Sequence, residues 1–212
     1  MHVPKTTTDK IHVLSFEDAL ADSGSTEYDR DKWIYVPDFY SEYRYILGTR
    51  VKHTLICVGI NPSTAAPDAL DNTLKSAQRI ALGNGYDSFI MFNVYAQRAT
   101  RPDDMEKKMN HTLHTENMKA FEYILKAASE SGNRPAVWAA WGAIIEKRDY
   151  LLGCVADMVA IGERYGTSWY TAGPRSKKAG HPHHPLYLKS DAKLDAFDAV
   201  GYCSGSTANK QS

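Results

Sequence analysis

The sequence predicts an α/β protein, a three-layer α/β/α sandwich around a mainly parallel central sheet. Two observations predict this fold: short apolar runs rich in β-branched and aromatic residues, and the helical segments that separate them. Strands that alternate with helices belong to βαβ units, whose strands run parallel and are covered on both faces. The runs are HTLICVGI (53–60), DSFIMFNVY (87–95), PAVWAAWG (135–142) and SWYTAG (168–173).

The segments between these runs have the spacing of amphipathic helices. After the first run, Asp71 or Asn72 is placed to cap a helix, whose apolar face is formed by Leu74, Ala77, Ile80 and Ala81. A second helix has an apolar face formed by Met118, Phe121, Leu125 and Ala128. A third helical segment covers residues 143–164, and we expect a kink near Gly153.

The chain divides into three parts. The first ~30 residues are polar and weakly patterned. We expect residues 1–41 to form an N-terminal extension or cap, residues 42–198 the α/β domain, and residues 199–212 a flexible C-terminal tail. DKWIYVPDF (31–39) and EYRYILG (42–48) alternate apolar with polar residues, which is typical of edge strands.

The composition is that of a soluble globular protein, with 43% hydrophobic residues, 24% charged residues and zero formal net charge. Tight non-specific DNA binding depends on excess basic charge, so this balance argues against a protein that coats DNA, while leaving room for a local basic groove. No apolar run approaches the ~18 residues of a membrane span, and the N-terminus lacks the secretory pattern. The isolated Cys57, Cys154 and Cys203 indicate neither a disulfide framework nor a zinc site. We expect a cytoplasmic protein.

Polar residues follow each predicted strand at its carboxyl end, which is where open α/β sheets bind ligands. These residues lie in Gly59-Ile60-Asn61-Pro62-Ser63-Thr64, in Asn93 to Arg98, in Trp141-Gly142 and in Lys177 to His181. Each has a simpler explanation: Asn61-Pro62 as a turn, Asn93 as a local backbone partner, Arg98 and Lys178 as solvated charge. Because all four segments meet at one sheet edge, together they predict a pocket.

The loop GHPHHPLYL (180–188) raises a separate question, because three histidines stand close together. His181, His183 and His184 are potential metal ligands, but no Cys, Asp or Glu accompanies them at a familiar ligand spacing. The flanking prolines also stiffen the loop. We therefore predict no metal, and favour a rigid loop that presents one imidazole to the pocket.

Four motifs carry a family resemblance. They are GINPS (59–63), FNVYAQRAT (92–100), AVWAAWG (136–142) and GHPHHPLYL (180–188). In this order they resemble the bacterial domain-of-unknown-function family 1643, over residues 42–198. That family in turn is similar to the uracil-DNA glycosylase superfamily, whose members share an α/β/α sandwich with a G-x-N/D-P loop after the first core strand.

The resemblance implies a hydrolase that acts on the N-glycosidic bond of a nucleobase in DNA, a nucleotide or a nucleoside, without a cofactor. Asn61 would orient the attacking water, Asn93 would read the base, and His181 or His184 would stabilise the departing base. Arg98 and Lys178 would contact phosphate. The remaining substrate-binding residues would be Gly59, Ile60, Pro62, Ser63, Thr64, Tyr95 and Gly142.

Departures from the superfamily pattern keep other functions open. Asn61 cannot act as a general base, Ser63 replaces a glycine, and the histidine loop is one residue longer, so either His181 or His184 matches the catalytic histidine. One alternative is a nucleotide or modified-base binding protein without catalysis. Another is a metal-dependent hydrolase that uses the histidine loop with Asp68 or Asp71, although helix capping explains these two residues more simply.

Overall fold

The computed structural model describes residues 1–21, 27–50 and 52–208. Within these ranges, seven strands form one mixed sheet in the order β1-β2-β4-β3-β5-β6-β7. The neighbouring strands β4, β3, β5 and β6 are parallel, whereas β1, β2 and β7 pair antiparallel. The strands are β1 Trp33–Val36, β2 Ile46–Thr49, β3 Thr54–Gly59, β4 Ser88–Asn93, β5 Ala136–Ala139, β6 Ser168–Ala172 and β7 Leu194–Ala196.

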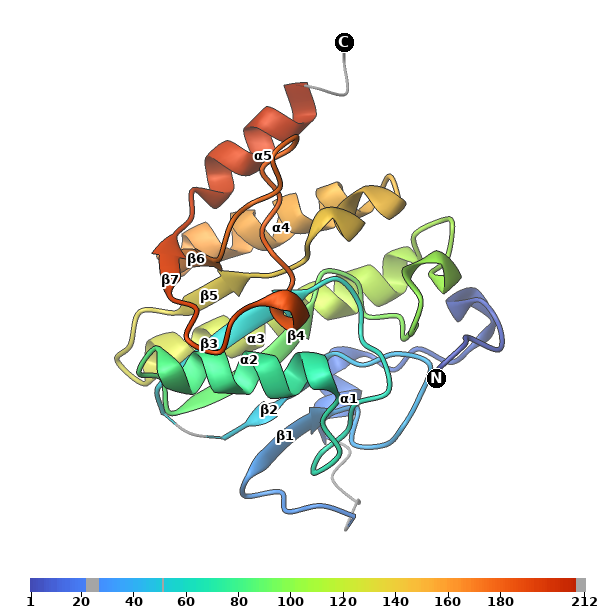
Figure 1. Cartoon of the computed structure of the whole chain (residues 1–212). Coiled ribbons are helices and arrows are strands. Elements are labelled where there is room, and N and C mark those ends of the chain that lie inside the picture. Colours follow the sequence, from blue (N-terminus) through green and yellow to red (C-terminus); the bar gives the residue numbers. More distant parts are fainter. Residues whose placement is uncertain (22–26, 51, 209–212) are drawn as a thin grey trace.

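Helices cover both faces of this sheet (Figure 1). The α-helices are α1 Phe16–Ala21, α2 Asn72–Gly83, α3 His111–Glu130, α4 Leu151–Arg164 and α5 Ala199–Ala208. Short 3-10 helices are η1 Thr8–Lys10, η2 Pro102–Asp104, η3 Ala143–Lys147 and η4 Pro185–Tyr187. The predicted α/β class and parallel centre are thus confirmed.

The central strands are buried on both faces, which explains their continuous apolar sequences. In β3, Leu55 and Cys57 pack in the core under α2, while Ile56 and Val58 pack in the core under α3 and α4. Helix α2 begins where the sequence predicts, because the Asp71 carboxylate accepts a hydrogen bond from Leu74 N at 2.9 Å. The predicted apolar face of α2 is buried throughout.

The chain changes sides of the sheet between β3 and β5. Strand β3 leads into α2 on one face, whereas its neighbour β5 leads through η3 into α4 on the other face. The loops after these two strands therefore diverge at the carboxyl edge of the sheet. Such a switch point is where open α/β sheets place their ligand sites.

Three predicted elements differ from the structure. Strand β2 is not an edge strand, because it pairs with both β1 and β4. The break in the segment 143–164 falls after η3 and not at Gly153, which lies inside α4, because Arg148 is extended and donates hydrogen bonds to the carbonyls of Met105 and Glu106. The tail predicted from residue 199 is helical over its first ten residues.

The residues predicted to form an N-terminal extension are packed into the α/β domain. Within residues 1–41, β1 completes one side of the sheet, and Phe16 of α1 is buried in the core shared with α3. Residues 209–212 of the predicted tail lie outside the described residues. Across the described ranges, no helix combines the length and apolar character needed to cross a membrane.

Candidate functional site at the carboxyl edge of the sheet

The loops after β3 and β4 run side by side. Backbone hydrogen bonds join Val94 N to Gly59 O, Tyr95 N to Ile60 O and Ala99 N to Pro62 O, at 2.9–3.0 Å. Asn61 closes the contact, because its Nδ2 donates to Ala99 O at 2.6 Å and to Pro62 O at 3.0 Å. With the nitrogen held twice, the side-chain oxygen is the remaining acceptor of Asn61. Ile60 and Pro62 are buried, Ser63 is half-buried and Thr64 is exposed.

Asn93, the last residue of β4, is 1% exposed, and neither its Nδ2 nor its Oδ1 has a partner among the described residues. Gly59 stands opposite in the register, and a Cβ added there would lie 3.3 Å from Asn93 Oδ1. A buried amide without hydrogen bonds costs about 1–3 kcal/mol for each unsatisfied group. Its donor and acceptor are therefore available to a bound ligand.

His184 lies at the switch point. A Cβ added at Gly142, whose φ of 66° favours glycine, would lie 3.5 Å from the Cβ of His184. The loop is held on α2 by a 2.8 Å hydrogen bond from Ser76 Oγ to Pro185 O. Leu186 N donates to His184 Nδ1 at 3.3 Å, which places the proton of a neutral ring on Nε2. Burial, and next the neighbouring His183, lower the pKa of His184.

His181 has different surroundings. Its Nδ1 lies 2.7 Å from the Tyr202 hydroxyl and its Nε2 lies 3.0 Å from Glu146 Oε1. The hydrogen bond from His181 lowers the pKa of Glu146. These residues line a cavity of about 800 Å³ between η3, residues 175–181 and α5, and no residue of the loop after β3 lines it. His184, and not His181, is thus the histidine beside the switch point.

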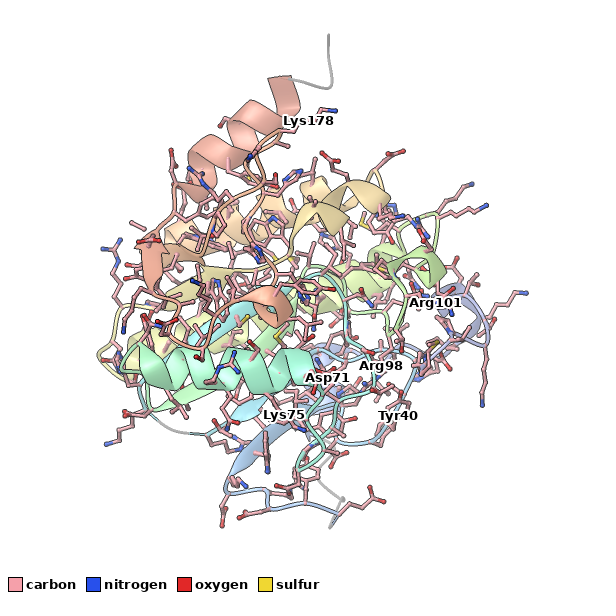
Figure 2. The ribbon with its side chains drawn as sticks, in the orientation of Figure 1. Tyr40, Asp71, Lys75, Arg98, Arg101 and Lys178 are labelled. Carbon is pink, nitrogen blue, oxygen red and sulfur yellow. The ribbon has the colours of Figure 1, made fainter. Side chains whose placement is uncertain are left out.

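The structure does not bring the predicted phosphate contacts together. Arg98 is 0% exposed, and its guanidinium donates to the carbonyls of Ser63 and Ala65 and to the Tyr35 hydroxyl. Lys178 lines the cavity around His181, and Figure 2 shows it beside α5, far from Arg98. Tyr95 is also fully buried, and its hydroxyl bonds Glu106 and the backbone of Asn110.

Sequence reasoning missed Arg44, Glu146 and Tyr202. Arg44 is an isolated arginine in an aromatic and aliphatic run, which was a signal that its side chain is buried with that strand. Tyr202 lies in the segment AFDAVGYC, whose apolar residues indicate packing although the segment directly precedes the polar end of the chain. Glu146 carries no distinguishing sequence signal, because its role depends on the distant His181.

The alternative of a metal site in the histidine loop requires a set of ligands close together. In the described part of the chain, no group of three His, Cys, Asp or Glu residues is close enough to hold an ion. His183 Nδ1 lies 3.0 Å from the carbonyl of His184. Asp68 Oδ1 is bound by Lys32 Nζ at 3.2 Å and by Trp33 Nε1 at 3.1 Å, and Asp71 caps α2.

The fold and these loops define an α/β protein with a polar site at the carboxyl edge of its sheet. The chain belongs to the family described as "Protein of unknown function (DUF1643)", which matches residues 44–186. The match contains the first three predicted motifs and most of the fourth. No curated protein matches the chain. The relationship to uracil-DNA glycosylases stays a prediction.

Proposed function

We propose that this protein binds the nucleobase of a nucleotide or of DNA at the switch point and hydrolyses its N-glycosidic bond. The observation that carries the proposal is the buried amide of Asn93, which has no hydrogen-bond partner within the described ranges of the chain. A primary amide offers one acceptor and two donors in one plane, which matches the hydrogen-bonding edge of a nucleobase. A bound base would supply the partners that the polypeptide does not.

The chemistry needs a positioned water and a donor for the departing base. Cleavage breaks the bond between the sugar carbon and the base nitrogen, so that positive charge develops on the sugar and negative charge on the base. The water oxygen then bonds to the sugar carbon, and the proton that this water loses passes to the departing base. The acceptor oxygen of Asn61 would orient the water, and the Nε2–H of neutral His184 would donate to the base oxygen. A preorganised donor of this kind is worth about 2.7–4 kcal/mol in the transition state.

The order of the motifs supports a uracil-DNA glycosylase-like arrangement. Asn61-Pro62 follows β3, the first parallel strand, and Asn93 ends β4, the second. Trp141-Gly142 follows the third, β5, and the histidine loop follows the fourth, β6. This is the order in which the resemblance places the water loop, the base-reading amide and the histidine loop.

Incubation with oligonucleotides and free nucleotides that carry normal and modified bases tests the proposal, with released base as the readout. Wild-type protein should release base from at least one substrate, and Asn93→Leu should release it about 100-fold more slowly. Asn133→Leu, the same change at an exposed site, should leave the rate unchanged. A wild-type protein inactive on the whole panel, or an Asn93→Leu variant of normal activity, contradicts the proposal.

The second candidate function is a binding protein without catalysis. The side chain of Asn61 favours it, because an amide cannot take a proton from water. Asn61→Ala separates the two functions. An enzyme would lose base release while it keeps ligand affinity. A binding protein would bind the same ligand before and after the change and would release no base in either form.

A further inference from the structure

Two buried arginines lie beneath the loop that follows β3. Arg44 is 1% exposed and Arg98 is 0% exposed, and both donate to the same carbonyl, that of Ala65, at 3.0 and 3.3 Å. Within the described residues, no carboxylate lies within 4 Å of either guanidinium, and the Nε atom of each has no partner. Buried charges are normally paired, so this arrangement requires an explanation.

Two carboxylates act on these arginines through space, and each is hydrogen-bonded to another group. Asp71 caps α2, and Glu42 lies 3.0 Å from His2 Nε2. Burial, and next the charge of Arg98, lower the pKa of Arg44 to about 9, which leaves it charged at neutral pH. Two positive charges therefore act on one side of the loop, offset only in part by Asp71, which raises the pKa of Arg44, and by Glu42, which raises the pKa of Arg98.

The arginines also decide which way the loop peptides face. In a planar trans peptide, the C=O and N–H point in opposite directions. The carbonyl of Ser63 is turned toward Arg98, so the N–H of Thr64 points away from the buried side. The carbonyl of Pro62 accepts from Ala99 N and Asn61, so the N–H of Ser63 also points away from them. Neither N–H has a protein partner in the ranges that the structure describes.

We infer that the outer face of the Ser63-Thr64 loop binds a phosphate group. The two N–H groups and the Thr64 hydroxyl are donors, and the buried arginines supply the charge from behind. The Ser63 and Thr100 hydroxyls bond each other at 3.1 Å, so one of the two is left to donate to the ligand. Lys75 in α2 and Arg101, three residues after Arg98, are exposed cations, and the Arg98 guanidinium lies over the Tyr40 ring at 4.2 Å; these residues and Asp71 are labelled in Figure 2. The ligand class is a phosphate ester, and its identity as a nucleotide or nucleic acid rests on the proposed function.

A purely structural role for the arginines makes a different prediction from a phosphate site. In Arg44→Met, Arg98 still holds the carbonyls of Ser63 and Ala65, and an unpaired buried charge is removed. Folding stability should stay the same or rise, as when buried charges are replaced by apolar residues of similar volume. Phosphate affinity should fall about tenfold, the usual effect of losing one charged interaction. If the arginines only hold the loop in place, the phosphate affinity and the folding stability of Arg44→Met should fall together.

Calorimetric titration of wild type, Arg44→Met and Lys126→Met tests the inference. The last variant removes an exposed charge on α3 and should bind as wild type does. The ligands are inorganic phosphate, a nucleoside 5′-monophosphate, the matching nucleoside and a short single-stranded oligonucleotide. We expect the monophosphate to bind more tightly than the nucleoside, with most of the difference lost in Arg44→Met. Tighter binding of the oligonucleotide would identify nucleic acid as the source of the phosphate.

The outcomes separate the two proposals. Equal affinity for nucleoside and monophosphate, or equal phosphate affinity in wild type and Arg44→Met, overturns the phosphate site and leaves the base site standing. Phosphate binding without nucleoside binding overturns the base site alone. Should Arg44→Met fail to fold, the double variant Ser63→Ala/Thr64→Val removes the hydroxyl donors and should weaken phosphate binding, and wild-type affinity in that variant would equally overturn the site.

Discussion

Asn61 and Asn93 are the same residue type, but their surroundings give them different capacities. The amide nitrogen of Asn61 is held by two backbone carbonyls, so its orientation is set and its oxygen is the available acceptor. Both polar atoms of Asn93 are buried and have no partner among the residues that the structure describes. A held amide suits the positioning of a small molecule such as water, whereas an unpaired one suits recognition of a ligand that brings both a donor and an acceptor.

His184 makes folding stability depend on pH. Because burial lowers its pKa in the folded state, the folded protein favours the neutral ring. Its contribution to stability is fully present above the ordinary histidine pKa of about 6.5 and is lost as pH falls through the lowered value. Urea unfolding at pH 7.5 and pH 5 should show a smaller loss in His184→Gln than in wild type. His12→Gln, at an exposed position, should behave as wild type, and equal losses in all three would refute the prediction.

At the scale of elements, α5 connects the end of the chain to the histidine loop. The Tyr202 hydroxyl in α5 bonds His181 Nδ1, and the same hydroxyl accepts a hydrogen bond from Trp141 Nε1 at 3.3 Å. The aromatic rings of Trp141, Phe197 and Tyr202 pack together, with centroids 5.5–6.2 Å apart. This packing orders residues that would otherwise have the composition of a flexible tail.

Tyr202→Phe should therefore destabilise the protein by about 1 kcal/mol, because His181 and Trp141 each lose a hydrogen-bond partner while the ring remains. Chemical unfolding measures the difference. Val200→Ala, at an exposed site of the same helix, should change stability by less than about 0.5 kcal/mol. Unchanged stability in Tyr202→Phe would show that α5 does not hold the loop.

At the scale of the whole molecule, the first twenty residues form hydrogen bonds with the loop beside the candidate site. His2 N donates to Thr100 Oγ1 at 2.7 Å, and Thr8 N donates to Glu106, so the N-terminal segment binds the loop that carries Arg98. Phe16 N donates to Glu116 at 2.7 Å, and the Phe16 ring is buried. The segment is therefore part of the structure that positions the site.

Deletion of residues 1–20 should lower the free energy of unfolding by about 3 kcal/mol or more, because burial of Phe16 alone is worth about 1.5–3 kcal/mol. Hydrogen exchange should become faster in residues 98–106, whose partners are removed. Lys10→Ala, a change at an exposed site of the same segment, serves as the control and should leave both measurements unchanged. Full protection of 98–106 after the N-terminal deletion would contradict this role.

Local patterns of residues were sufficient to predict much of the fold. The four apolar runs, the Asp71 cap and the apolar face of α2 depend on neighbours within a few residues, and the structure confirms them. The same kind of pattern could not place β2 inside the sheet, because alternation looks alike in an edge strand and in a strand paired on both sides. Periodicity reports which face is buried and not which strand lies alongside.

The sequence by itself determined the α/β class and the family, and it placed polar loops after the parallel strands. Only the tertiary structure decided that His184 lies at the switch point while His181 faces α5. It also decided that Arg44 and Arg98 share one carbonyl, with no carboxylate of the described residues within 4 Å of either. These features join distant residues, as the bond between Ser76 and Pro185, 109 positions apart, illustrates. The physical reason is that a side chain's charge and hydrogen bonds depend on its spatial neighbours, which chain packing selects and local sequence does not specify.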